Sequence, residues 1–302
     1  MDLKSKIILI YGPTSSGKSQ LAVKLAKKIN GEVINADSMQ IYKELNILTA
    51  RPFKSDYKKI KHHLYGFQNV KKKFSTGAWL KLVNKKILDI KKRKKTPILV
   101  GGTGLYFKAL TEGLVNIPNI PIKFRTSVRS LHKKLGSKKF FLKLIKLDPL
   151  SKKYLNFTDT QRVIRSYEVK SFTKKSIFDW FKSTKSEYEN NDFYKIYIDY
   201  PRADLIKQIN YRTQNMIKNG AILEVKKFIK LKVPKLRTPS KAIGIKEIRE
   251  YLDKKSEMLE LIEKISIKTR QYAKRQVTWS RGHMSDWNKI KSNNLNQFLK
   301  KI

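Results

Sequence analysis

The clearest chemical motif in the chain is a loop that could bind phosphate groups. Residues 12–19 fit the pattern G-x-x-x-x-G-K-[ST] completely. Glycines let the backbone wrap closely around phosphate oxygens, so that successive N–H groups face the anion. Lys18 adds a positive charge, and the Ser19 hydroxyl is a candidate ligand for Mg²⁺. The motif predicts a di- or triphosphate site formed by Gly12, Pro13, Thr14, Ser15, Ser16, Gly17, Lys18 and Ser19.

The loop alone leaves the reaction open. A kinase or nucleoside triphosphatase that binds ATP in such a loop also has an acidic residue at the end of a strand, which helps to hold the metal. Asp37 and Asp199 both follow apolar runs typical of strands, so either could be that acid. A third alternative is a basic RNA-binding protein in which the loop is only structural. The rest of the chain has to decide between these classes.

The elements around the loop predict an α/β fold. A short apolar run at residues 6–11 precedes the loop, and residues 21–29 show helical spacing after it. An amphipathic helix is expected at residues 81–95. Further strands are expected at residues 32–36, 97–100 and 195–200. Alternating strands and helices predict a P-loop NTPase-like parallel sheet flanked by helices, with ligands at the carboxyl ends of the strands.

The pattern changes in the middle of the chain, where a lysine-rich segment of helical period follows the prolines at 118 and 121. We therefore expect the first part of the P-loop core in residues 1–115 and a helical insertion domain in residues 116–193. Residues 194–302 should complete the core, with its last strand and the C-terminal helices. The tail after Trp287 carries little pattern.

Composition excludes several kinds of site. The chain has no cysteine, which removes disulfides, thiolate nucleophiles and the usual structural zinc sites. It has only four histidines, and adjacent residues such as His62 and His63 point to opposite faces of a strand, so we assign no metal to that pair. A metal held by hydroxyl, carboxylate and phosphate oxygens would be Mg²⁺.

The net charge favours a polyanionic partner. The 68 basic and 24 acidic side chains give a formal charge of +44, which attracts nucleic acid through counterion release. A lysine-rich composition is also expected from an AT-rich genome, so charge alone does not identify the partner. The apolar run at residues 7–11 is too short for a membrane span, and the first residues do not read as a targeting segment. We expect a cytoplasmic protein that binds no membrane.

Four further motifs carry a family resemblance. They read NADSMQIYKELNILTARP at residues 35–52, VGGTGLYF at 100–107, TDTQRVIR at 158–165 and TRQYAKRQVTWSRG at 269–282. With the phosphate loop they resemble, in order from residue 6 to about residue 282, the tRNA isopentenyltransferase (IPP transferase) family of bacterial tRNA dimethylallyltransferases. The absence of cysteine fits a bacterial form, because eukaryotic members commonly add a zinc finger.

The resemblance implies a prenyl transfer. The dimethylallyl group would move from dimethylallyl diphosphate to N6 of the adenosine on the 3′ side of the anticodon, tRNA position 37, with release of diphosphate. Asp37, which follows a strand, would be the general base, because the adenine amine must lose a proton. By resemblance, Thr14 lies beside the reacting centre and Arg212 reaches the diphosphate, while Lys18 and Mg²⁺ at Ser19 would stabilise its charge.

The resemblance also implies contacts to the tRNA anticodon stem-loop by an enzyme that acts as a monomer. Thr103 is among these contacts, although it could equally cap the next helix. The family usually has Gly-Tyr where this chain has Gly244-Ile245, so a contact by that tyrosine is lost. The implied contact residues are Asp37, Ser38, Met39, Gln40, Thr103, Arg125, Gln161, Arg162, Val163, Ile164, Arg165, Lys241 and Lys246.

Overall fold

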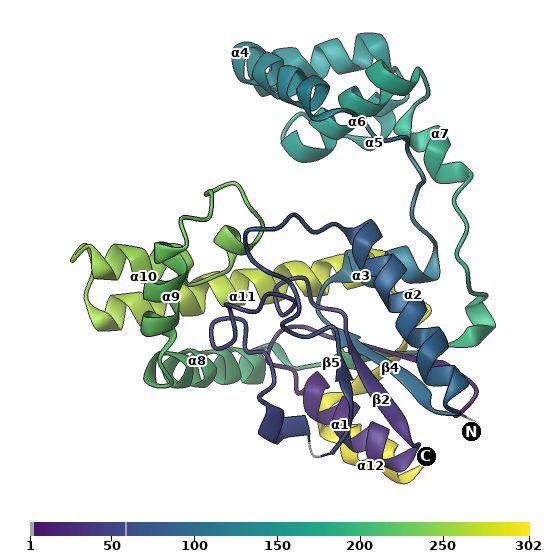
Figure 1. Ribbon diagram of the computed structural model, residues 1–302, viewed down its shortest axis with the longest axis vertical. Helices are drawn as coiled ribbons and strands as arrows, with labels where there is room; N and C mark the ends of the chain where they lie inside the picture. The colour runs from purple at the N-terminus through teal and green to yellow at the C-terminus, as the bar shows by residue number, and fades with distance from the viewer. Residues whose placement is uncertain (1–2, 58) are drawn as a thin grey trace. The chain divides into compact units, whose positions relative to one another are not determined.

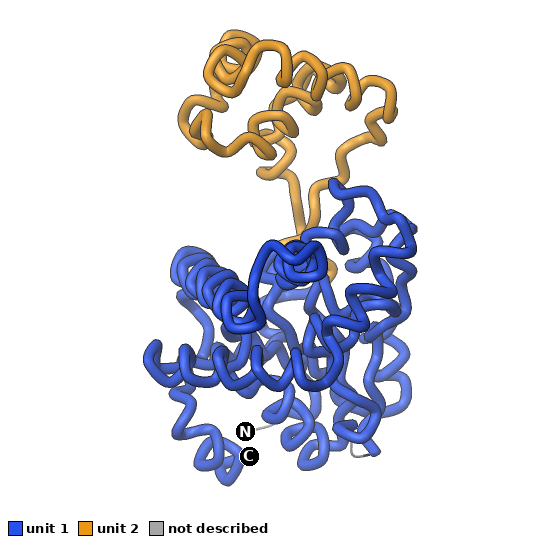
Figure 2. The backbone as a smooth tube through the Cα atoms, turned by 90° about the vertical axis from the view of Figure 1, so that its left-hand side faces the viewer, with its two compact units in different colours: residues 1–111, 188–302 blue, residues 112–187 orange. Residues whose placement is uncertain are grey.

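The chain folds into two compact units. The computed structural model describes residues 3–57 and 59–302. One unit contains the chain up to Thr111 together with Tyr188–Ile302, and the helical unit contains Glu112–Glu187 (Figure 2). The insertion was expected at residues 116–193. The observed boundary lies earlier because Tyr188 already packs against the core of the larger unit and a strand begins at Phe193.

A six-stranded parallel sheet forms the centre of the larger unit (Figure 1). The strand order is β3-β2-β4-β1-β5-β6, and every registered pair runs parallel. The predicted fold class, a P-loop NTPase-like parallel sheet flanked by helices, is confirmed. The strands are β1 Ile7–Tyr11, β2 Gly31–Asn35, β3 His62–His63, β4 Thr96–Gly101, β5 Phe193–Asp199 and β6 Asn288–Lys291.

Helices cover both faces of the sheet. In β1, Ile8 and Ile10 pack toward α1 (Lys18–Lys28). The alternate residues Ile7, Leu9 and Tyr11 pack on the opposite face, toward α2 (Thr76–Lys92) and α3 (Gly104–Thr111). A strand buried on both faces needs apolar residues throughout, which explains the unbroken run that predicted it. The α2 helix begins before the expected residue 81 because the Ser75 side chain accepts a hydrogen bond from the Ala78 amide at 3.1 Å.

The expectation that the strand near residues 195–200 is the last one is wrong. The β6 strand follows it and pairs with β5 at the edge of the sheet. Its sequence, NKIK, contains one apolar residue and is mostly exposed, so no apolar run marks it. The short helix α12 (Leu295–Lys300) then packs against the α1 face of the sheet through side chains that include Phe298.

Four helices complete the larger unit. They are α8 Arg202–Lys218, α9 Ala221–Lys230, α10 Ile245–Leu252 and α11 Met258–His283. Together with residues 41–48 they surround a second apolar cluster. The long α11 helix packs along α8 and also reaches α3, so residues late in the sequence lie close to the carboxyl ends of the central strands (Figure 1).

The helical unit has an apolar core of its own, which includes Val128, Phe140, Leu144 and Val163. Its longest helix, α4 (Ile122–Leu147), is interrupted at Gly136, whose φ of 73° is a left-handed conformation that glycine adopts without strain. The other helices are α5 Ser151–Tyr154, α6 Thr160–Thr173 and α7 Ile177–Lys182.

In the larger unit, short 3₁₀ turns lie at Lys54–Tyr57, Asn190–Asp192, Pro239–Lys241 and Ser292–Asn294. Among the helices of the described residues, none is long and apolar enough to cross a membrane.

Candidate active site

The predicted phosphate loop connects the end of β1 to the start of α1. Gly17 caps the helix with a φ of 77°, a left-handed conformation that favours glycine. The Lys18 ammonium bends back over the loop and donates to the Pro13 carbonyl at 3.0 Å. Residues 14–19 line a pocket of about 750 Å³. A backbone wrapped in this way at a helix N-terminus is suited to a phosphate group.

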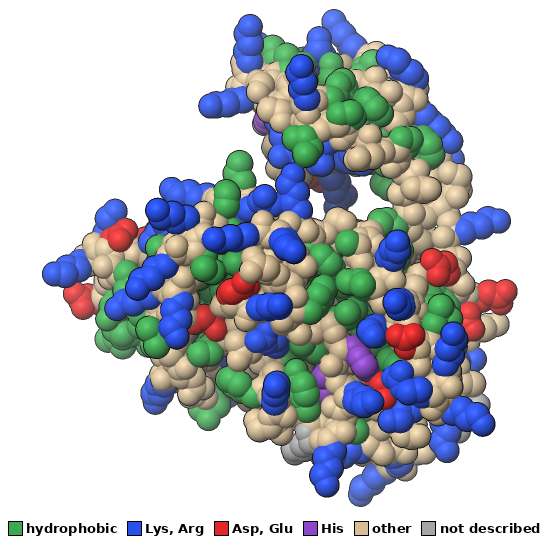
Figure 3. All heavy atoms as spheres, viewed as in Figure 1, with side chains coloured by type: hydrophobic (Ala, Val, Ile, Leu, Met, Phe, Trp, Pro, Cys, Tyr) green, Lys and Arg blue, Asp and Glu red, His purple; other side chains and the backbone are tan. Residues whose placement is uncertain are grey.

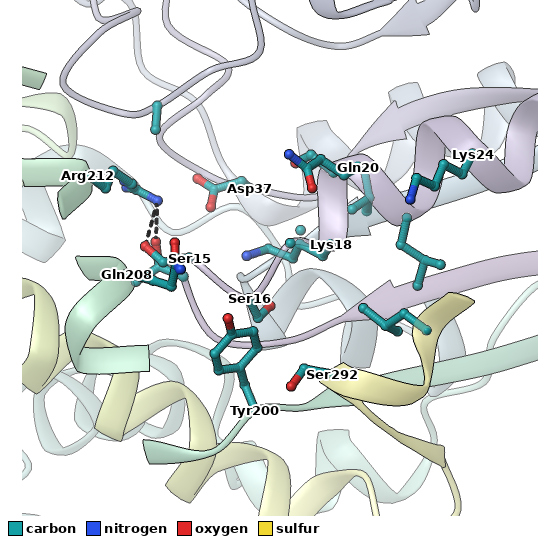
Figure 4. Close-up of a pocket in the computed structure, with 18 of the residues that line it drawn as sticks. Ser15, Ser16, Lys18, Gln20, Lys24, Asp37, Tyr200, Gln208, Arg212 and Ser292 are labelled. Carbon is teal, nitrogen blue, oxygen red and sulfur yellow. Dashed lines mark hydrogen bonds between the residues drawn. The ribbon is translucent and has the colours of Figure 1, made fainter. Parts of the chain in front are cut away.

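The four residues predicted to be catalytic line this same pocket. Lys18 from α1, Asp37 from the segment after β2 and Arg212 from α8 point toward a common space (Figure 4). The Arg212 guanidinium Nη1 donates to the Thr14 hydroxyl at 2.8 Å and to the Ser15 hydroxyl at 3.4 Å. Residues separated by almost 200 positions in the sequence are thereby brought to one point at the carboxyl ends of the strands.

Two half-buried cations, Lys18 and Arg212, line this pocket. Burial lowers the pKa of Lys18 to about 8, although the Asp37 carboxylate opposes that shift; the nearby Arg212 charge adds to it. Burial likewise lowers the pKa of Arg212, again against the effect of Asp37. An anionic ligand would relieve both effects, because it would replace the lost hydration of the two cations. The electrostatics of the pocket therefore favour a di- or triphosphate.

Backbone and side-chain hydrogen bonds fix the Asp37 carboxylate. Its Oδ1 atom accepts from the Met39 amide at 2.8 Å and from the Gln40 amide at 3.4 Å. The Asn35 side chain accepts from the Asp37 amide at 2.9 Å and donates to the Asp37 carbonyl at 3.0 Å. Asp199, the other candidate acid, is exposed at the end of β5. Of these two acids, it is Asp37 that lines the pocket.

A second, smaller pocket of about 330 Å³ meets the first at Thr14, Asp37 and Arg212. Its lining mixes apolar side chains with hydroxyl-bearing and charged ones. The apolar ones include Met39, Leu48, Met216, Ile243 and Ile265, and the polar ones include Ser38, Thr213, Thr269, Lys241 and Arg275. The carboxylate of Asp37 thus lies between a phosphate-binding space and a space that could hold a group with both apolar and polar parts. Such an arrangement can hold two reactants on either side of one base.

The predicted contacts that follow β2 and β4 lie together. The Thr103 hydroxyl accepts from the Ser38 amide at 2.9 Å and donates to the Ser38 hydroxyl at 3.2 Å. These bonds tie the segment after β4 to the segment after β2. The Gln40 side chain donates to the Thr49 and Ala50 carbonyls, both at 3.1 Å, so its nitrogen supports the pocket wall.

The sequence reasoning missed several residues of the site that α11 contributes. Tyr272 and Arg275 line the second pocket, and Gln276 accepts from the Thr14 amide at 2.8 Å. Burial, together with the Asp37 charge, raises the pKa of Tyr272, so its phenol stays neutral. All three lie in the motif at residues 269–282, and none of the three was assigned to the site from the sequence. The signal that could have identified these residues was their place in a motif shared with the family.

The other predicted contacts lie in the helical unit, on α4 and α6. Gln161 and Arg162 are exposed, but Val163 and Ile164 are buried in the core of that unit and their side chains are not surface contacts. The buried Glu168 carboxylate gathers three arginines. It accepts from Arg125 at 3.2 Å, contacts Arg165 at 3.4 Å and lies 3.8 Å from Arg129. Among the charged side chains on the visible surface of both units, lysines and arginines prevail over aspartates and glutamates (Figure 3).

The two predicted lysines near residue 244 are both exposed. Lys241 lines the second pocket, whereas Lys246 lies 3.6 Å from the Glu250 carboxylate on α10. Ile245, which departs from the family pattern, is buried in the apolar cluster of the C-terminal helices. The chain therefore uses this position for packing.

The pocket offers oxygen ligands that fit Mg²⁺. Ser19 lies in the first turn of α1 and lines the pocket together with Asp37. A hydroxyl, a carboxylate and the oxygens of a bound diphosphate are the hard donors that Mg²⁺ prefers. No cluster of three or more histidine, aspartate or glutamate ligands occurs within residues 3–57 and 59–302. A metal here would thus be held largely through the diphosphate.

Comparisons with known proteins identify the family of this chain. The family model described as IPP transferase matches residues 40–283. A tRNA dimethylallyltransferase of Pelagibacter ubique is 58% identical over 302 residues, covering 100% of this chain and 96% of that protein. One of Rickettsia massiliae is 44% identical over 300 residues, covering 99% and 83%.

Solved structures give the same result. A eukaryotic dimethylallyltransferase acting on tRNA superimposes with a TM-score of 0.83 at 29% identity, over 97% of this chain and 75% of that one. The tRNA isopentenylpyrophosphate transferase of Bacillus halodurans gives 0.71 at 30% identity, over 98% and 95%. The family model and the relatives span most of the sequence, and both the phosphate loop and Asp37 have the geometry such a site needs. The chain belongs to the IPP transferase family.

Proposed function

We propose that this chain transfers the dimethylallyl group from dimethylallyl diphosphate to N6 of the adenosine 3′ to the anticodon, tRNA position 37. The observation that carries the proposal is the position of Asp37 where the phosphate pocket meets the second pocket. The similar proteins named as tRNA dimethylallyltransferases support it. Because tRNA is the acceptor, we propose that the enzyme is cytoplasmic. We also propose that it acts as a monomer.

In this proposal the phosphate loop holds a leaving group. The diphosphate of the donor would lie against the loop amides of residues 15–19, with Lys18 and Arg212 on its oxygens. Charge builds on the bridging oxygen as the C1–O bond breaks, and fixed cations in a dry pocket stabilise that charge. Mg²⁺ bound at Ser19 would supply further charge neutralisation to the diphosphate.

The adenine amine is the nucleophile. Its nitrogen forms a bond to C1 of the dimethylallyl group while the C1–O bond breaks and the electron pair leaves with the diphosphate. The attacking N6 carries a proton that Asp37 would accept. The hydrogen bonds from the Met39 and Gln40 amides hold the carboxylate in one orientation for this transfer. The Thr14 hydroxyl, oriented by Arg212, lies beside the same point.

We propose that residues of the larger unit and residues of the helical unit both contact the tRNA. The target base would leave its stack, which costs less free energy in a single-stranded anticodon loop than in a duplex. It would then contact Asp37, Ser38, Met39, Gln40 and Thr103. Lys241 and Lys246 would add contacts to the larger unit. In the helical unit we restrict the proposed contacts to Arg125, Gln161, Arg162 and Arg165, whose side chains are at least partly exposed.

The test is incubation with unmodified tRNA, Mg²⁺ and either dimethylallyl diphosphate or ATP, followed by mass analysis of the nucleosides. An adenosine heavier by one five-carbon unit, found only with the allylic donor, would establish the reaction. ATP turnover without a prenylated base would move the chain to the kinase or triphosphatase class. Tight tRNA binding with neither product would instead indicate an RNA-binding protein.

The lowered pKa of Lys18 predicts a pH dependence of donor binding. The ammonium is protonated below a pKa of about 8 and loses its charge as the pH rises through that value. We therefore expect kcat/KM for dimethylallyl diphosphate to fall above about pH 8, because the free enzyme loses a positive charge on the loop. In Lys18→Arg, whose guanidinium stays charged, this alkaline fall should disappear even if activity is lower overall. An unchanged alkaline limb in that variant would contradict the assignment.

A single arginine of the helical unit tests the proposed tRNA surface. Arg162 is 72% exposed and forms an ion pair at 3.2 Å with Asp159, the N-cap residue of α6. Arg162→Ala should weaken tRNA binding and reduce the slope of log K against log salt by roughly one. Fluorescence titration of tRNA at several salt concentrations measures both quantities. The control is Lys92→Ala, which removes one charge from an exposed position on α2. Equal effects in both variants would show that only the net charge of the protein matters and that Arg162 makes no specific contact to tRNA.

A further inference from the structure

One buried side chain connects the two loops that frame the site. Gln276 lies on α11 and is 5% exposed. Its amide oxygen accepts from the Thr14 amide at 2.8 Å, and its amide nitrogen donates to the Gly102 carbonyl at 2.9 Å. The first partner belongs to the phosphate loop and the second to the segment that follows β4. A primary amide can serve both partners because it has a donor and an acceptor on one planar group.

The surroundings fit this amide closely. The Tyr11 hydroxyl donates to the Gln276 backbone carbonyl at 3.0 Å, which fixes the turn of α11 that carries the side chain. The side chain also hydrogen bonds to Tyr272, which lines the second pocket. A Cβ atom on Gly102 would lie 2.2 Å from the Gln276 Nε2 atom, so the glycine is needed for the amide to approach. A shorter or differently shaped side chain could not make both bonds.

Each end of this bridge leads directly to the chemistry. Thr14 accepts a hydrogen bond from Arg212 through its hydroxyl, while its amide is committed to Gln276. Gly102 precedes Thr103, whose hydroxyl holds the Ser38 amide next to Asp37. The bridge therefore sets the spacing between the phosphate side and the acceptor side of the site. Reaction needs the two reacting atoms about 3–3.5 Å apart, and a displacement of about 1 Å can cost 10²-fold in rate.

We propose that Gln276 is a positioning residue, which aligns the phosphate loop with the acceptor segment through Thr14 and Gly102. The proposal rests on the proposed prenyl transfer. Gln276 acts through its two partners and is not among the residues that line the two pockets, so its loss should lower kcat and leave substrate binding largely intact.

The test compares Gln276→Met, which keeps the side-chain length without the amide, with Thr278→Ala at an exposed position on the same helix. We expect kcat of Gln276→Met to fall by roughly 10²-fold, with KM for the donor and the tRNA dissociation constant within about threefold of wild type. Thr278→Ala should match wild type. Equal losses of kcat and of the folded or donor-binding fraction would indicate damage to the fold and overturn the proposal.

A second variant approaches the bridge from its other end. Gly102→Ala leaves Gln276 in place but pushes its amide away, so it should reproduce the fall in kcat. The double variant should be no slower than the slower single variant, since both changes break one connection. Losses that multiply would show that the residues act separately and would overturn the proposal.

Amide hydrogen exchange tests whether the Gln276 bridge forms, and it does not depend on prenyl transfer. Exchange of the Thr14 amide should be faster in Gln276→Met than in wild type or Thr278→Ala. Faster exchange with unchanged kcat would overturn the positioning role. A wild-type chain that transfers no prenyl group would overturn the proposed function and this proposal with it. The exchange result then still tells whether the bridge forms, so the two failures are distinguishable.

Discussion

Asp37→Asn should reduce the single-turnover rate of prenyl transfer by roughly 10²–10⁴-fold, the usual contribution of a general base. Asparagine has almost the same shape, and its oxygen can still accept from the Met39 amide, so the loop should keep its structure. What is lost is the ability to take the proton from the adenine amine. The tRNA dissociation constant and the affinity for inorganic diphosphate should stay close to the wild-type values.

The matched control for this prediction is Asp199→Asn. Asp199 also follows a strand, but it is exposed at the end of β5. Like Asp37, it could serve as the metal-binding acid of a kinase or triphosphatase. We expect wild-type activity in this variant. Full activity in Asp37→Asn, or a large loss in Asp199→Asn, would show that the base is assigned to the wrong strand.

Arg212→Met should lower the rate of transfer by roughly 10²–10³-fold, as expected when a fixed donor to a developing negative charge is removed. The guanidinium is half-buried and already oriented by its bonds to the Thr14 and Ser15 hydroxyls. It can therefore meet the leaving diphosphate without reorganisation. Arg212→Lys should recover part of the rate, because an ammonium keeps the charge but not the planar pair of donors.

Single-turnover kinetics with saturating donor separate this role from simple binding. If Arg212→Met raises KM for dimethylallyl diphosphate and leaves the transfer rate unchanged, the arginine contributes only to ground-state binding. Arg202→Met on the same helix is the control, because Arg202 is exposed at the start of α8. It should behave like wild type in both parameters.

Two kinds of information in the sequence made the site predictable. The phosphate loop is local: its glycines, Lys18 and Ser19 follow one another, so the spacing alone specifies the backbone shape. Asp37 follows a buried apolar run, and the carboxyl ends of parallel strands meet at one edge of a sheet. Arg212 was different. Its surroundings in the sequence are ordinary, and only the family resemblance singled it out.

The elements that were missed lacked such signals. The β6 strand has a single apolar residue because it forms an exposed edge of the sheet, and the helical unit ends earlier than expected because Tyr188 packs on the other core. Val163 and Ile164 belong to a motif predicted to contact tRNA, but both are buried. Membership of a motif does not show which of its side chains face the solvent. Gln276 was overlooked among basic residues, since one glutamine in a helix has no periodicity to mark its burial.

The fold class, the phosphate loop and the acid beside it could be predicted from the sequence, because each depends on short-range patterns of residue type. Which distant side chains line the pocket with them depends on three-dimensional packing. Packing of α8 and α11 against the strand ends brings Arg212 to Thr14 at 2.8 Å and Gln276 between the loops. Those contacts span up to 262 residues, and they arise from how whole helices pack rather than from any local pattern.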